Sequence, residues 1–131
     1  MNKKIIIAIG IIVFLLLFTF IYLIININNS KELELTYKTN GGVPYEWKYK
    51  IADESIVKFV KTKDITSKEE KKLVGGPVYI NYIFKGIKNG KTTITFKYVN
   101  IVDDTVEKED KIIVKVDKNK NISLVDKIKT K

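Results

Sequence analysis

The side chains that most often perform catalysis are absent from this chain or lie in solvated stretches. The sequence has no Cys and no His, which excludes Ser-His and Cys-His nucleophile pairs and thiolate or imidazole metal sites. Three carboxylate pairs stand in Lys-rich stretches where nothing would desolvate them: Glu69-Glu70, Asp103-Asp104 and Glu109-Asp110. Asp103-Asp104 with Glu107 fits no calcium loop, and no Walker-type phosphate loop is present. The sequence therefore predicts no catalytic residue, cofactor or metal, and a protein that is not an enzyme.

Two Gly- and Pro-containing stretches have the composition of shaped binding loops. The first is Asn40-Gly41-Gly42-Val43-Pro44-Tyr45-Glu46-Trp47, and the second is Val74-Gly75-Gly76-Pro77. Glycine permits φ > 0 and close backbone approach, and proline fixes one dihedral, so such loops hold one shape and present backbone to a partner. We interpret them as parts of a binding module. The alternative is that the glycines only form tight turns and that Trp47 belongs to the core.

Alternating apolar and polar residues predict strands throughout the region after residue 31. β-Branched and aromatic residues recur with period two near 33–37, 47–51, 56–60, 78–84, 94–98, 112–116 and 122–124. Seven short strands in about 100 residues indicate an all-β, immunoglobulin-like β-sandwich. We expect this domain over residues 32–125, followed by a frayed tail at 126–131.

Turn and capping residues predict how some of these strands connect. Lys88-Asn89-Gly90, inside the segment 86–90, predicts a turn that joins the two long strands beside it in a hairpin. Residues 62–72 are polar, which predicts an exposed loop or a short helix capped by Ser67.

An uncharged apolar run extends from Ile5 to Ile25. About 20 apolar residues span a bilayer core, and no small-residue cleavage site follows. We expect a cytoplasmic tail at 1–4, a transmembrane signal anchor at 5–26 and a linker at 27–31. Lys3 and Lys4 favour a cytoplasmic N-terminus and an extracellular domain on the cell membrane. A cleaved signal peptide, which would release a secreted domain, is the alternative.

The chain is strongly basic. Its 24 basic residues are all lysines, against 15 acidic residues, which gives a formal net charge of +9. The lysines are scattered along the strands, and arginine, the main base-reading residue, is missing. We therefore expect a solvated Lys-rich surface and no nucleic-acid partner. Attraction to an anionic envelope or lipid surface is the alternative.

The order of the loop motifs resembles the chagasin family, protein inhibitors of papain-like cysteine peptidases with an immunoglobulin-like fold. The matching residues are Asn40-x4-Tyr45-x-Trp47, then Gly75-Gly76, then Gly90-x7-Tyr98, and the resemblance covers about 33–116. The family pattern is Asn-Pro-Thr-Thr-Gly-aromatic-x-Trp, a Gly-rich loop and Tyr-x-Arg-Pro-Trp. This chain departs from the pattern twice: Gly41-Gly42-Val43-Pro44 replaces Pro-Thr-Thr-Gly, and Asn100-Ile101-Val102 stands at the Arg-Pro-Trp segment.

The resemblance implies a steric mechanism, in which three loops at one end of the sandwich fill the active-site cleft of a papain-like cysteine peptidase. It places the protein-binding residues in those loops: Asn40, Gly41, Gly42, Val43, Pro44, Tyr45, Gly75, Gly76, Pro77, Val99, Asn100 and Ile101. Trp47 and Tyr98 would support the loops from below. The missing threonines and Arg-Pro-Trp leave a second hypothesis open, a non-inhibitory immunoglobulin-like module for binding or adhesion in the cell envelope.

Overall fold

The computed structural model describes residues 1–28 and 31–130, which fall into two units divided after Ser30. The first unit holds helix α1 (Lys3–Asn28). Its segment Lys3–Ile25 is long and apolar enough to cross a membrane, by length and composition, and none of it is buried in the protein. The helix fits either the predicted anchor or a signal sequence. Residues 29–30 of the predicted linker lie outside the described residues.

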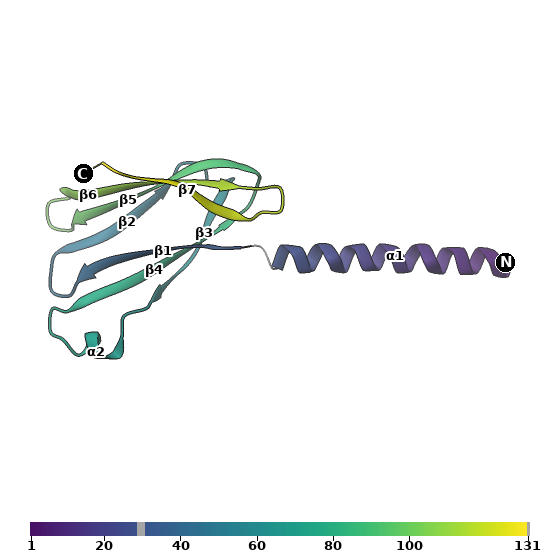
Figure 1. The fold of residues 1–131 in the computed structure, drawn as a ribbon, viewed down its shortest axis with the longest axis horizontal. Coiled ribbons are helices and arrows are strands. Elements are labelled where there is room, and N and C mark those ends of the chain that lie inside the picture. Colours follow the sequence, from purple (N-terminus) through teal and green to yellow (C-terminus); the bar gives the residue numbers. More distant parts are fainter. Residues whose placement is uncertain (29–30, 131) are drawn as a thin grey trace. The chain divides into compact units, whose positions relative to one another are not determined.

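The second unit contains two antiparallel β-sheets (Figure 1). A three-stranded sheet has the order β1-β4-β3, and a four-stranded sheet has the order β2-β5-β6-β7. The strands are β1 (Leu33–Asn40), β2 (Tyr45–Ile51), β3 (Val57–Asp64), β4 (Pro77–Gly86), β5 (Gly90–Asn100), β6 (Val106–Val116) and β7 (Ile122–Lys129). This arrangement confirms the all-β sandwich and its seven strands.

The core lies between the two sheets and follows from the period-two pattern of the strands. Alternate residues of β5 and β6 face inward and are fully buried, among them Ile94, Phe96, Ile112 and Val114. Phe84 of the other sheet meets Phe96 edge to face, with ring centroids 6.0 Å apart. Every residue of the core cluster belongs to this unit. With no cysteine in the chain, no disulfide joins the layers, and apolar packing between the sheets is the main interaction that holds them together.

The predicted hairpin across residues 86–90 is wrong. β4 ends at Gly86 and β5 begins at Gly90, but the two strands belong to different sheets. The turn therefore carries the chain from one layer to the other, and Ile87 N–H donates to the Ile56 carbonyl at 2.8 Å in the course of it. The hairpins of the four-stranded sheet are β5–β6 and β6–β7.

The expected C-terminal tail is also partly wrong. β7 continues through residues 126–129, because Lys129 pairs with Asp110 of β6. By contrast, the short capped helix is confirmed as α2 (Lys68–Lys71). The Ser67 hydroxyl accepts from Glu70 N–H at 3.2 Å, and the Glu70 carboxylate accepts from Ser67 N–H at 3.4 Å, which forms a capping box. Residues 62–64 belong to β3 rather than to this loop.

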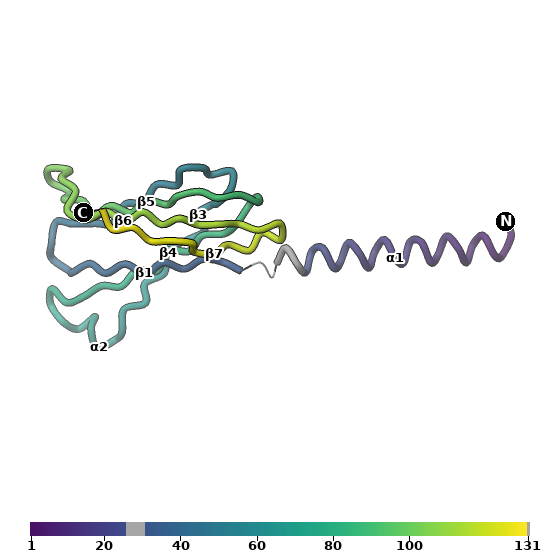
Figure 2. Tube along the Cα trace, turned by 45° about the horizontal axis from the view of Figure 1, so that its top comes forward, coloured from purple at the N-terminus to yellow at the C-terminus, as the bar shows by residue number. Residues whose placement is uncertain are grey.

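The strand directions place three connections at one end of the domain and the chain's entry at the other. β1 runs from the entry end to the loop end, and the β1–β2, β3–β4 and β5–β6 connections lie together there in both views (Figures 1 and 2). At the opposite end, Lys31 N–H donates to the Asn121 side chain in the β6–β7 turn at 2.8 Å. The domain therefore presents its three loops away from the point where the chain enters it.

Replacing Phe96 by alanine tests the packing of the core. Phe96 is fully buried, so we expect the free energy of unfolding to fall by about 3–5 kcal/mol. Urea unfolding followed by fluorescence of the single tryptophan measures the loss. As a control on the same strand, the exposed Lys97→Ala should change stability by less than about 0.5 kcal/mol. Equal losses in the two variants would contradict this account of the core.

Candidate functional site

Three loops, defined here by residues, form the candidate site. Loop 1 is residues 41–44, loop 2 is residues 65–76 and loop 3 is residues 101–105. Gly41 N–H of loop 1 donates to the Gly76 carbonyl of loop 2 at 3.0 Å, and Ile101 N–H of loop 3 donates to the Pro44 carbonyl of loop 1 at 2.8 Å. Loop 1 is therefore the central member, tied by backbone hydrogen bonds to a loop on either side.

The glycines of loops 1 and 2 serve different purposes. Gly42 and Gly75 have φ values of 79° and 68°, which side chains other than glycine rarely adopt. Gly76 does not have a positive φ, but a Cβ there would lie 2.7 Å from the Leu73 Cβ. At Gly41 an added Cβ would meet only ordinary contacts at 3.7 Å. Of these four glycines, which all permit φ > 0 and close backbone approach, two thus adopt a positive φ, and a third, Gly76, is closely approached by its neighbours.

Loop 3 is shaped by two side chains that accept backbone hydrogen bonds. The Asn100 Oδ1 accepts from Val102 N–H at 2.8 Å. The Asp103 Oδ1 accepts from the Thr105 hydroxyl at 2.7 Å and from Thr105 N–H at 3.0 Å, and these bonds lower the pKa of Asp103. Asp104 then adopts φ 60°, a conformation that Asp tolerates better than most residues. The loop therefore has a defined shape without the Arg-Pro-Trp of the family pattern.

Aromatic rings pack directly beneath the loops. Tyr45, the first residue of β2, stacks on Tyr98 with centroids 5.1 Å apart. Trp47 lies 4.9 Å from Tyr98 and 4.4 Å from Tyr37 between ring centroids. The Trp47 Nε1–H also donates to the Lys38 carbonyl at 2.9 Å, which joins β2 to β1 of the other sheet. Trp47 and Tyr98 thus lie where residues that support the loops should lie.

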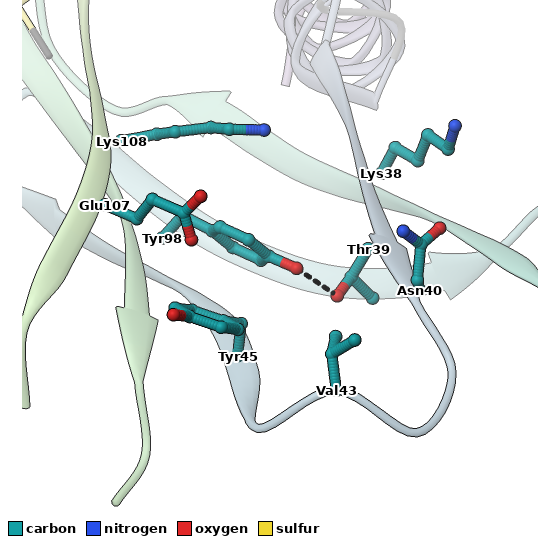
Figure 3. A pocket seen from close by; sticks show the side chains of 8 residues that line it. All are labelled: Lys38, Thr39, Asn40, Val43, Tyr45, Tyr98, Glu107 and Lys108. Atoms are coloured by element: carbon teal, nitrogen blue, oxygen red, sulfur yellow. Dashed lines mark hydrogen bonds between the residues drawn. The ribbon is translucent and has the colours of Figure 1, made fainter. Parts of the chain in front are cut away.

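A hollow of about 340 Å³ opens beside loop 1, between β1 and β6. In Figure 3 the rings of Tyr45 and Tyr98 lie one over the other along it, with Val43 facing them from loop 1. The Tyr98 hydroxyl reaches across the hollow to Thr39 Oγ1 at 2.9 Å (Figure 3). Together with the bond from Trp47 to Lys38, this bond joins the two sheets just below the loops.

The residues predicted to contact a partner differ in how accessible they are. Asn40, Gly42, Val43, Pro44, Gly75 and Ile101 are exposed, whereas Gly41, Tyr45, Gly76, Pro77 and Asn100 are half-buried. Val99 is only 6% exposed, because the pairing of β5 with β6 shifts register between Tyr98 and Val99. The predicted contact role of Val99 is therefore wrong, and its side chain belongs to the packing of the domain.

Three further apolar residues at the loop tips are exposed, beyond those predicted to contact a partner. Val74 in loop 2 is fully exposed, Leu73 beside it is 59% exposed, and Val102 in loop 3 is 80% exposed. Together with Val43 and Ile101, they place apolar side chains on the tips of all three loops. Their position in the sequence could have indicated a contact role, because each is an apolar residue in a loop and belongs to no strand or helix pattern.

The site offers shape and apolar contact rather than reactive groups. Among residues 1–28 and 31–130, no three His, Cys, Asp or Glu side chains are grouped to hold a metal ion. The carboxylates of loop 3 are exposed, and the bonds that engage Asp103 serve the loop itself. The arrangement can place three loops, joined by backbone hydrogen bonds, against a complementary protein surface.

Comparison with known protein families identifies the class to which this fold and these loops belong. The family model described as "Chagasin family peptidase inhibitor I42" matches residues 26–116, most of the chain. The chain therefore belongs to the chagasin family of peptidase inhibitors, and the resemblance seen in the sequence is confirmed. No curated protein and no solved structure matches the chain.

Adding one methyl group at Gly76 should loosen the link between loops 1 and 2. In Gly76→Ala the new Cβ would collide with Leu73, move the Gly76 carbonyl and break its bond from Gly41 N–H. Losing one hydrogen bond costs about 1 kcal/mol, so amide hydrogen exchange at residue 41 should become about fivefold faster. In the matched variant Gly41→Ala, the methyl group has room, and exchange at residue 41 should stay close to wild type. Equal acceleration in both variants would show that crowding at Gly76 does not hold the link.

The pKa of Asp103 provides a test of the structure of loop 3. Because the native hydrogen bonds favour the carboxylate, its pKa should lie below the ordinary value of about 3.9. The stability it adds to the folded loop is therefore present at pH values above about 4 and is lost as pH falls through the native pKa. An NMR titration of the carboxyl carbon measures the value. Thr105→Val removes the hydroxyl donor and should raise the pKa toward 3.9, and an unchanged pKa would contradict the assignment.

Proposed function

We propose that this chain is a membrane-anchored inhibitor that blocks a papain-like cysteine peptidase outside the cell. Its three loops would enter the active-site cleft together and exclude substrate, with no bond made or broken. The pair of backbone hydrogen bonds that ties loop 1 to loops 2 and 3 carries this proposal. Loops that are already fixed before binding lose little conformational entropy in the complex, which favours affinity.

The apolar loop tips support the same function by a different contact chemistry from the family pattern. Loop 1 lacks the two threonines, and loop 3 lacks the Arg and Trp. In their place, Val43 stands on loop 1 and Ile101 and Val102 on loop 3, all exposed. Burying such side chains on a partner contributes about 25 cal/mol per Å² of apolar area. We therefore expect the target to offer an apolar cleft, with Val74 of loop 2 as the most protruding contact.

The topology of the domain supports presentation of the loops to a partner in solution. The chain enters the domain at the end opposite the loops, beside the β6–β7 turn. Helix α1 precedes that entry point and is apolar over a membrane-spanning length. With Lys3 and Lys4 on the cytoplasmic side, the domain would stand outside the cell with its loops free.

A charge at the tip of loop 2 should weaken inhibition without affecting the fold. Val74→Asp changes a fully exposed side chain, so stability should be unchanged, but an unpaired carboxylate would have to be desolvated in the cleft. We expect the inhibition constant against papain-like peptidases to rise at least about tenfold. Inhibition is measured with the full chain in detergent micelles. Val125→Asp is the control: it places the same charge at an apolar position of β7 that is 51% exposed and lies away from the loops, and it should inhibit like wild type.

Two outcomes would contradict the proposal. If the wild-type chain leaves a panel of papain-like peptidases uninhibited at micromolar concentration, inhibition of those targets is excluded. If it inhibits them but Val74→Asp and a replacement of Gly41–Val43 inhibit equally well, the loops are not the contact. The first outcome would favour the second candidate, a non-inhibitory envelope-binding module. The absence of the threonines and of Arg-Pro-Trp is the observation that motivates this candidate.

A further inference from the structure

A groove continues from the loop end along the side of the domain. The hollow beside loop 1 is lined by Lys38 and Lys108, and both lysines also line a second hollow of about 240 Å³. The second hollow adds Lys127 and Lys129 of β7 to its lining. We call the two hollows together the basic groove, defined by Lys38, Lys108, Lys127 and Lys129.

The groove has an excess of positive charge over an aromatic floor. Four lysines face two carboxylates, and one of these, the buried Asp110, is already paired with Lys127 at 3.5 Å. Lys108 lies over the Tyr98 ring and Lys127 over the Tyr37 ring, each 5.4 Å from the centroid. Among the described residues, no carboxylate lies within salt-bridge distance of Lys38, Lys108 or Lys129. The groove therefore attracts anionic groups.

The Tyr37 ring forms part of the floor of the groove, and its hydroxyl is buried beneath that floor. Burial, and secondarily the nearby Asp110 carboxylate, raise the pKa of Tyr37 far above its ordinary value, so the hydroxyl keeps its proton. The groove therefore carries no tyrosinate charge that would offset its lysines.

Two strand edges border the groove, and each is partly open in the described part of the chain. β1 is an edge strand of its sheet, although its Lys38 carbonyl accepts from Trp47 Nε1–H. On the other side, β6 pairs with β7 only from Asp110 onward and the Glu109 carbonyl accepts from Thr130 N–H, which leaves Val106–Lys108 without a strand partner on that flank. Open edges can take a further extended segment through main-chain hydrogen bonds. A concave, ring-floored groove between such edges fits a polypeptide, whereas a flat bilayer surface cannot enter it.

We propose that the basic groove binds an acidic, extended segment of the same peptidase that the loops engage. The inference rests on the proposed function, because the groove is continuous with loop 1 through Val43 and Asn40. A partner held by the loops would bring its neighbouring surface over this side of the domain. Carboxylates of that segment would pair with Lys38 and Lys108. The groove would then select among peptidases with similar clefts by the charge beside the cleft.

Binding of a model peptide tests the groove without any peptidase. The probe is a fluorescent peptide of alternating glutamate and glycine, added to the full chain in neutral detergent micelles and followed by anisotropy. A peptide with lysine in place of glutamate should not bind. Lys38→Gln with Lys108→Gln should weaken binding of the acidic peptide about fivefold or more at physiological salt, since two charge pairs are lost. The matched control, Lys58→Gln with Lys85→Gln, removes a directly paired lysine couple of β3 and β4 that does not line the groove, and should change binding less than about twofold.

Three results would overturn the inference. They are no binding of the acidic peptide, equal weakening in both double variants, and tighter binding of inorganic polyphosphate with the same dependence on Lys38 and Lys108. The second would indicate unspecific charge attraction, and the third would assign the groove to an anionic polymer.

Inhibition assays on the same proteins separate this inference from the proposed function. If the chain binds the acidic peptide through the groove but inhibits no peptidase, the loop mechanism is wrong. The groove would then bind an acidic segment, but not one of a peptidase held by the loops. If the chain inhibits a peptidase and the groove variant slows association while the control variant does not, both proposals are supported. If the groove variant inhibits as well as wild type at both low and physiological salt, the groove does not bind the peptidase, and the loop mechanism is unaffected.

Discussion

The contact of Trp47 with the opposite sheet is the constraint on which the loop end depends. The chain has no disulfide, so the two layers are positioned only by what packs between them. Trp47 packs on Tyr37 and Tyr98, and its indole N–H reaches the Lys38 carbonyl across the sandwich. This single side chain therefore fixes the spacing of β1 and β2 just below the loop that joins them. Loop 1, and through it loops 2 and 3, inherit their positions from that spacing.

The loops are joined through backbone groups, and this has a consequence for how their sequences can vary. The bonds from Gly41 to Gly76 and from Ile101 to Pro44 need no particular side chain on either partner. The shape of the loop end can therefore persist while the residues at the tips change from polar and aromatic to aliphatic. In this chain the scaffold and the Gly-rich loop match the family pattern, while the side chains of loops 1 and 3 differ from it. In the proposed mechanism, backbone groups would set the shape of the loop end and the side chains at the tips would set its specificity.

Much of the fold could be predicted because the strands alternate cleanly, and Ser67 with Glu70 forms a readable helix cap. The role of Lys88-Asn89-Gly90 could not, because a turn sequence reports a reversal of the chain but not which sheet the next strand joins. The burial of Val99 follows from a register shift that leaves no trace in the pattern. Trp47 and Gly76 were recognised from their motifs, whereas Leu73 was not, since an apolar residue in a polar loop matches no local rule. The residues that line the basic groove come from five strands, so the groove is visible only once the strands are assembled.

The entry of the chain at the end opposite the loops bears on how the protein would work at a surface. β1 alone spans eight residues, or about 26 Å, between the entry point and loop 1. In the proposed anchored form, the loops would stand at least that far from the residue where the chain enters the domain. Such a domain would meet peptidases that approach the cell far more often than a freely diffusing inhibitor at the same average abundance, because tethering raises its local concentration. Cleavage between the helix and the domain would release the inhibitor from the cell that made it, and the released domain could then also protect neighbouring cells.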